Sequence, residues 1–255
     1  MITQNSTGSL TTTIENKIAM LEFGHPASNS FPRELLDLVT NALNSLSDNP
    51  DVSVIVMRSE GTGAFCAGAS FDELLAVSNL EEGTKFFSGF AYLINAMRSC
   101  KKLIVGRVHG KAVGGGVGIA SACDYVFATN NAAIKLSELA IGIGPFVIEP
   151  SVSRKIGKTA LAEMTLAAHE WKSADWAKEK GLYAYTFENT EDLDAALENF
   201  CSKLASYNPE ALIEMKKVLW EGTDHWETLL LERAAITGKL VLSEYSKKAL
   251  TQFKK

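Results

Sequence analysis

The sequence predicts an α/β fold with a largely parallel sheet and a helical C-terminal region. Three apolar, β-branched runs of strand length are bounded by turn residues, at positions 52–57, 103–105 and 125–127. Helical patterns lie between these runs, and strands that alternate with helices are typical of a parallel sheet covered by helices. After about residue 190 the strand patterns stop and only helical patterns remain.

The first elements are strands followed by a helix. The segment from Ile14 to Phe23 predicts one or two short strands, ended by the turn at 24–26. A helix is expected to begin near Pro32 and to end at the turn residues 48–50. The apolar residues of this helix recur at a spacing that places them on one face: Leu35, Leu38, Val39, Ala42 and Leu46.

The C-terminal region is predicted to be helical over 192–206, 210–220, 228–241 and 244–253. These helices are too few for an independent bundle, so we expect an assembly element or a lid. Apolar residues crowd into the span 229–242, which is more apolar surface than a tail lying on one domain needs to bury. They are Leu229, Leu230, Leu231, Ile236, Leu240, Val241 and Leu242.

Composition excludes several classes of protein. The chain has 255 residues, of which 46% are hydrophobic, and its net charge of −5 argues against a nucleic-acid partner. No apolar stretch reaches the roughly 18 residues of a membrane span, and the polar segment 1–13 does not resemble a secretory signal. The four cysteines form no CxxC pair and the histidines form no HExxH, so we expect a cytoplasmic protein without a metal site.

Two glycine-containing segments, 61–71 and 110–118, follow predicted strands. Neither matches a dinucleotide-binding GxGxxG, a P-loop or the GxSxG of serine hydrolases. Three consecutive glycines at 114–116 precede a helical stretch. Glycine lets a ligand lie against the main chain, and the first N–H groups of a helix have no intrahelical partner. The two segments together therefore predict an oxyanion hole, which polarises a carbonyl and stabilises an enolate.

These motifs resemble those of one enzyme superfamily. The run 105–116, followed by Ser121-Ala122-Cys123-Asp124, resembles the central motif of the enoyl-CoA hydratase/isomerase (crotonase) superfamily. The run Ala64-Phe65-Cys66-Ala67-Gly68-Ala69 resembles its first oxyanion-loop motif, and the stretch 157–182 also has family character. The resemblance covers about residues 14–253.

The resemblance implies a crotonase-like spiral of ββα units with a C-terminal helical region. Residues 1–195 would form the core that binds an acyl-CoA thioester, and residues 196–255 would serve oligomerisation and cover the active site. It further implies a homotrimer or hexamer that acts in fatty-acid metabolism. No separate cofactor is expected, because coenzyme A is part of the substrate.

The resemblance also implies the site residues. The backbone N–H groups of Ala69 and Gly115 would bind the thioester oxygen. Where the family often has Asp and Lys after the oxyanion residue, this chain has Ser70 and Asp72, which weakens the case for phosphate contacts there. The implied substrate-binding residues are Ala27, Ser28, Ala67, Ala69, Ser70, Phe71, Asp72 and Gly115.

The number of glutamates at the predicted site decides which reaction is favoured. Typical hydratases of this family carry one glutamate two positions after the glycine triplet, where this chain has Gly118, and a second that corresponds to Glu138. A single carboxylate suffices for a 1,3-proton shift, whereas two acids are better suited to hold and activate water. The sequence therefore favours isomerisation of 3-enoyl-CoA to 2-enoyl-CoA, with Glu138 as acid and base.

Two alternatives stay open at this point. The loop 142–149 resembles the Pro-Phe loop of some one-glutamate isomerases, but Glu149 is also a possible second acid, which would allow hydration of 2-enoyl-CoA. A helix N-terminal charge is an equally good interpretation of Glu149. The other alternative is a non-catalytic binding protein of the crotonase fold. Asp124, which ends a helix ahead of a strand, is interpreted as structural.

Overall fold

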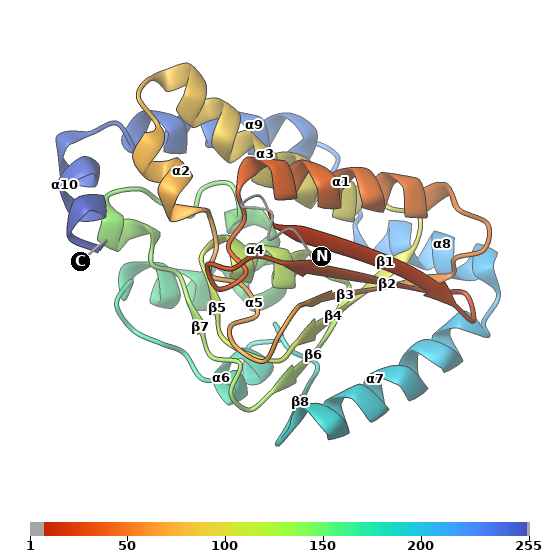
Figure 1. The fold of residues 1–255 in the computed structure, drawn as a ribbon. Coiled ribbons are helices and arrows are strands. Elements are labelled where there is room, and N and C mark those ends of the chain that lie inside the picture. Colours follow the sequence, from red (N-terminus) through yellow and green to blue (C-terminus); the bar gives the residue numbers. More distant parts are fainter. Residues whose placement is uncertain (1–7, 254–255) are drawn as a thin grey trace, which may run out of the picture.

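The computed structural model describes residues 8–253 and confirms the α/β class (Figure 1). Residues 1–7 of the polar N-terminal segment lie outside the described residues. Six strands form one sheet in the order β1-β2-β3-β4-β6-β8. The β1–β2 pair is antiparallel, and the other neighbouring strands of this sheet pair in parallel. The bounds are β1 (Ser9–Glu15), β2 (Ile18–Gly24), β3 (Val54–Ser59), β4 (Leu103–Val108), β6 (Tyr125–Thr129) and β8 (Tyr185–Phe187).

The first strand begins earlier than the apolar pattern indicates. β1 lies almost entirely before Ile14, and its last five residues are exposed because it forms the edge of the sheet. A threonine-rich edge strand carries no hydrophobic alternation, so the sequence pattern missed it. Asn16 and Lys17 form the turn to β2 with φ of 50° and 64°, the left-handed geometry that a two-residue hairpin requires.

Helices cover both faces of the sheet. On one face a large apolar core packs beneath α1 and α3, with α9 beside α3, and on the other face α7 covers a second cluster built on Val56, Val105 and Phe127 (Figure 1). The helices are α1 (Arg33–Asp48), α2 (Phe71–Ala76), α3 (Leu80–Ser99), α4 (Gly115–Ala122), α5 (Glu149–Leu166), α6 (Ala174–Glu179), α7 (Thr190–Ala205), α8 (Pro209–Leu219), α9 (Trp226–Leu240) and α10 (Glu244–Phe253).

The C-terminal helices follow the sequence pattern closely, but they do not form a detached layer. The boundary predicted between residues 195 and 196 lies inside α7, which packs Leu193, Leu197 and Cys201 against the sheet. Within residues 8–253, no helix is both long enough and apolar enough to cross a membrane.

A buried polar cluster joins α8 to the sheet. Asp124, just after α4, accepts hydrogen bonds from the backbone N–H of Ile104 (2.7 Å), from Nζ of Lys216 (2.7 Å) and from Nε1 of Trp220 (2.7 Å). Nζ of Lys216 also donates to the carbonyl of Met97. Both charged side chains are almost fully buried, with 3% and 4% exposed. The interpretation of Asp124 as a structural residue agrees with these contacts.

Candidate active site

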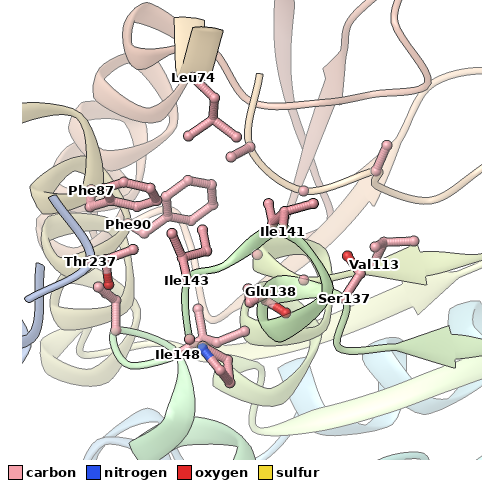
Figure 2. Close-up of a pocket in the computed structure, with 18 of the residues that line it drawn as sticks. Leu74, Phe87, Phe90, Val113, Ser137, Glu138, Ile141, Ile143, Ile148 and Thr237 are labelled. Atoms are coloured by element: carbon pink, nitrogen blue, oxygen red, sulfur yellow. The ribbon is translucent and has the colours of Figure 1, made fainter. Parts of the chain in front are cut away.

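A cavity of about 290 Å³ opens where the two glycine segments meet, and Figure 2 shows its lining. Two short strands, β5 (Ala112–Val113) and β7 (Ile134–Lys135), lead into it. After β7 the chain turns into a 3₁₀ helix, η1 (Glu138–Ile141), and then into a loop of residues 142–148 that reaches α5. Most of the lining is apolar, as is usual for ligand sites. Its large apolar side chains are Phe71, Leu74, Phe87, Phe90, Val113, Ile141, Ile143, Val147 and Ile148.

The two glycine segments approach each other closely at the cavity. Gly68 has φ of +90°, and a Cβ atom there would lie 3.3 Å from the backbone nitrogen of Gly115. Gly115 is the first residue of α4, so its N–H has no intrahelical acceptor. Within residues 8–253, neither this N–H nor that of Ala69 has a hydrogen-bond acceptor, and both residues line the cavity. Two unpaired backbone donors in the wall of one cavity are the groups from which an oxyanion hole is built.

Glu138 places its carboxylate beside Gly114, the residue that precedes Gly115. A Cβ atom on Gly114 would lie 2.9 Å from Oε1 of Glu138. Oε2 is shielded from solvent and has no hydrogen-bond partner in the described part of the chain. Burial raises the pKa of this carboxyl to about 7. A group with a pKa near neutrality both accepts and returns a proton efficiently, which suits a general acid/base.

The structure brings together half of the predicted substrate-binding residues. Ala67, Ala69, Phe71 and Gly115 line the cavity. The others lie outside its lining: Ala27, Ser28, Ser70 and Asp72. Two of these hold the loop in place, since the carbonyl of Ser28 accepts from the N–H of Ala67 and the hydroxyl of Ser70 caps α2 by accepting from the N–H of Glu73.

Neither Glu149 nor the position of Gly118 supplies a second acid to the cavity. Glu149 is not part of the cavity lining, and its carboxylate forms ion pairs with Arg233 and Lys158. Burial opposes the charge, but hydrogen bonds from these two cations outweigh it and lower the pKa of Glu149. At Gly118, a Cβ atom would lie 2.4 Å from Cγ2 of Ile148. The space beside Gly118 is therefore filled by a hydrocarbon side chain.

The apolar wall of the cavity escaped the sequence analysis. Phe87 and Phe90 come from α3, and Ile143, Val147 and Ile148 come from the loop of residues 142–148 (Figure 2). Helical periodicity indicates that a face of α3 is buried, but a buried face looks the same in sequence whether it borders a core or a cavity. In the described part of the chain, no three His, Cys, Asp or Glu side chains are grouped to hold a metal ion.

Comparison with known families agrees with this geometry. The family model described as "Enoyl-CoA hydratase/isomerase" matches residues 13–254. The chain belongs to the enoyl-CoA hydratase/isomerase family. Members of this family act on acyl-CoA thioesters. The cavity between the paired glycine segments, with Glu138 in its lining, is therefore the candidate site for such a thioester.

Relatives within the family carry different activities in their names. A probable enoyl-CoA hydratase of Bacillus subtilis is 25% identical over 242 residues, which cover 94% of this chain and 93% of that protein. A peroxisomal Delta(3,5)-Delta(2,4)-dienoyl-CoA isomerase of Arabidopsis thaliana is 28% identical, covering 70% of this chain and 68% of the relative. The crystal structure of enoyl-CoA hydratase from Bacillus halodurans shares the fold, with a TM-score of 0.88, 20% identity and coverage of 95% and 99%. The family is thus shared, while its members differ in reaction.

The oxyanion assignment of Gly115 predicts a loss of turnover when its N–H is removed. Any side chain at Gly115 would meet the ring of Phe90, with Cβ only 2.4 Å from Cε1, so the test is made in a Phe90→Ala background. Gly115→Pro there removes one donor at a helix position that tolerates proline, and kcat is expected to fall by about 10²–10³. Gly115→Ala in the same background keeps the N–H and is the control; equal turnover in the two variants would contradict the assignment.

Proposed function

We propose that this protein is an enoyl-CoA isomerase that converts 3-enoyl-CoA to 2-enoyl-CoA with Glu138 as its single acid/base. One observation carries the proposal. Glu138 is the only carboxylate among the described residues that line the cavity, and the position beside Gly118 is filled by Ile148. An isomerase needs one proton carrier, whereas this cavity offers no second acid to hold a water molecule.

The proposed reaction moves one proton and one double bond. The thioester oxygen accepts hydrogen bonds from Ala69 and Gly115, and the charge that develops on it is stabilised there. The Glu138 carboxylate removes a proton from the α carbon of 3-enoyl-CoA, and the electron pair of that C–H bond enters the thioester as an enolate. When the enolate collapses, the γ carbon takes the proton back from Glu138 and the double bond lies between the α and β carbons.

Hydration of 2-enoyl-CoA is the second candidate. Ser137, at the start of η1, lines the cavity, and its hydroxyl makes no capping hydrogen bond to that helix. A serine at this position usually caps the helix, so the hydroxyl is left available to hold a water molecule or a polar atom of the substrate. The probable hydratase of Bacillus subtilis favours the same alternative.

Parallel assays of 3-hexenoyl-CoA and 2-hexenoyl-CoA test the proposal. The isomerase proposal expects rapid conversion of the first and slow hydration of the second. Efficient hydration of 2-hexenoyl-CoA with no conversion of 3-hexenoyl-CoA would overturn it in favour of the hydratase. Binding of both thioesters without turnover would instead favour a non-catalytic crotonase-fold protein.

We also propose a homotrimer or hexamer, although the apolar C-terminal segment supports this less than the sequence analysis expected. Leu230 and Val241 are buried in the single chain. The other leucines of the segment pack against the same core, namely Leu229, Leu231, Leu240 and Leu242. Only Ile236 of the seven is exposed, at 46%. Sedimentation at micromolar concentration is expected to give the mass of a trimer or hexamer, and a monomer would refute this proposal.

The proposed location is the cytoplasm. All four cysteines are free thiols and are buried, which suits a reducing compartment. The net charge of −5 supports a protein without a nucleic-acid partner.

A further inference from the structure

The loop of residues 142–148, which we call the cavity loop, is held at both ends. At its start, the N–H groups of Gly142 and Ile143 donate to the carbonyl of Glu138, so the loop is tied directly to the acid/base. At its end, the N–H of Glu149 donates to the carbonyl of Pro145 (2.8 Å) as the chain enters α5. Between these two points it supplies five residues of the cavity lining: Ile143, Gly144, Pro145, Val147 and Ile148.

A cation from another helix holds the far end of this loop. Nη1 of Arg233, on α9, donates to the carbonyl of Phe146 (3.3 Å) and forms an ion pair with Oε2 of Glu149. Both side chains are largely withdrawn from water, with 26% of Arg233 and 16% of Glu149 exposed. Screening by solvent is therefore weaker than for an ion pair on an open surface. One guanidinium thus contacts the loop backbone and the first residue of α5 together.

The helix that carries Arg233 is itself firmly placed. Leu230 and Ala234 of α9 are fully buried against the core. On α3, the buried Arg98 forms an ion pair with Glu227 at 3.1 Å, and Thr237 of α9 reaches the cavity beside the aromatic wall (Figure 2). Arg233 therefore connects the cavity loop to a helix that already forms part of the same cavity.

Ile148 is the residue whose position depends on this connection. It directly precedes Glu149, is 4% exposed and fills the space next to Gly118. If the end of the cavity loop moved away from α4, the methyl groups of Ile148 would leave this space. Water would then have access to the bound acyl group at the position where two-acid hydratases of the family carry a carboxylate.

We infer that Arg233 and Glu149 form a positioning pair that holds Ile148 over Gly118 and so keeps the enzyme from adding water to its substrate. This inference rests on the proposed isomerase function. It adds the residues that set the balance between isomerisation of 3-enoyl-CoA and hydration of 2-enoyl-CoA. In hydration, the oxygen of water keeps one proton and bonds to the β carbon of 2-enoyl-CoA as a hydroxyl group. The other proton goes to the α carbon, where the electron pair of the former double bond forms the new C–H bond. Excluding water blocks this addition and leaves proton transfer by Glu138 untouched.

The test measures the ratio of 2-hexenoyl-CoA hydration to 3-hexenoyl-CoA isomerisation in matched variants. Arg233→Met removes the cation and keeps most of the aliphatic stem, and Glu149→Gln keeps the volume of the side chain while removing its charge. Ile148→Ala opens the space directly. Lys158→Met is the control, because Lys158 pairs with the same carboxylate, is 76% exposed and does not line the cavity.

The ratio is expected to rise about fivefold to tenfold in Arg233→Met, Glu149→Gln and Ile148→Ala, and to stay at the wild-type value in Lys158→Met. In the double variant Arg233→Met/Ile148→Ala, the rise should not exceed that of Ile148→Ala alone, because both changes free the same space.

Three outcomes would overturn the inference. The first is a wild-type ratio in both Arg233→Met and Glu149→Gln. The second is an equal fall of both activities, since a purely structural role would lower them together. The third is an equal rise in Lys158→Met. Should Arg233→Met fail to fold, Glu149→Gln decides the result. If wild-type protein does not isomerise 3-hexenoyl-CoA at all, the proposed function fails, which is distinguishable from an unchanged ratio in an active isomerase.

Discussion

Glu138→Gln is expected to lower turnover by about 10²–10⁴ while acyl-CoA binding persists. Glutamine has nearly the size of glutamate but cannot accept a proton, so the substrate still fits and the proton shift stops. The measurement is kcat on whichever enoyl-CoA the wild-type protein converts, together with the dissociation constant of a saturated acyl-CoA. A Gln variant with wild-type turnover would remove Glu138 from the mechanism. Glu149→Gln would then be the next variant to assay for loss of turnover.

The pH dependence of wild type follows from the same carboxyl group. Its pKa is raised from 4.5 to about 7, and the base form is needed to take the substrate proton, so kcat/KM is expected to fall as pH drops below about 7. The native state prefers the neutral carboxyl. Stability from this group is therefore fully present below pH 4.5 and is lost as pH rises through 7.

The loss of wild-type stability at high pH provides a control that the Glu138→Gln variant is folded. Glutamine is neutral at every pH, so Glu138→Gln should be more stable than wild type at pH 8, by on the order of 3 kcal/mol, and about equally stable at pH 4.5. Denaturant unfolding at the two pH values measures the difference. A variant that is inactive but more stable at pH 8 has lost its chemistry and kept its fold. A variant less stable at pH 8 would contradict the burial argument.

The second large effect is expected at the cluster around Asp124. Lys216→Met removes the cation that faces this buried carboxylate and leaves the carboxylate with Trp220 and the N–H of Ile104 as partners. Breaking a buried ion pair typically costs about 3–5 kcal/mol of unfolding free energy. The lower end of that range is expected here, because Lys155, whose Nζ donates to the carbonyl of Asp124 (2.9 Å), stays nearby. Lys217→Met is the matched control, since the neighbouring Lys217 is 65% exposed and pairs on the surface with Glu214. Its cost should stay within about 0.5 kcal/mol.

Urea unfolding of both variants measures these costs. Lys216→Met at wild-type stability would show that the buried pair adds nothing net. Asp124→Asn/Lys216→Met is a useful companion, because removing both charges leaves no unpaired ion and should cost less than the sum of the two single changes.

Sequence patterns predicted the elements whose burial is periodic. The parallel strands β3, β4 and β6 are apolar runs between turn residues, and α1 carries one apolar face, so each of these elements was predicted. The predicted face of α1 was wrong at Leu38, which is 42% exposed, because the buried stripe runs through Leu36 and Leu43 instead. The edge strand β1 was shifted, because exposed threonines leave no hydrophobic signal. The boundary after residue 195 fell within α7, since amphipathic periodicity identifies a helix but not the surface that it covers.

The residues of the candidate site also fall into a group that the sequence predicts and a group that it does not. Ala69, Gly115 and Glu138 lie within short motifs, and the structure places all three in one cavity. The contact between Ile148 and Gly118 joins residues 30 positions apart, and Arg233 lies 84 positions beyond Glu149. A single sequence holds no trace of such contacts, because the charge of Arg233 and the hydrophobicity of Ile148 suit many other partners equally well.

The cluster around Asp124 has a consequence for biosynthesis. Lys216 follows Asp124 by 92 residues, so at about 5–20 residues per second the ribosome delivers the cation roughly 5–20 seconds after the carboxylate. During that interval the neighbouring strands β4 and β6 are complete, but the Asp124 carboxylate still lacks Lys216, its ion-pair partner in the folded protein. Burying the carboxylate before α8 emerges carries a desolvation cost that Lys216 does not yet offset, which favours a state in which this part of the core is open to water. Molecular chaperones and proteases that recognise incomplete cores therefore have a defined period in which to act on it.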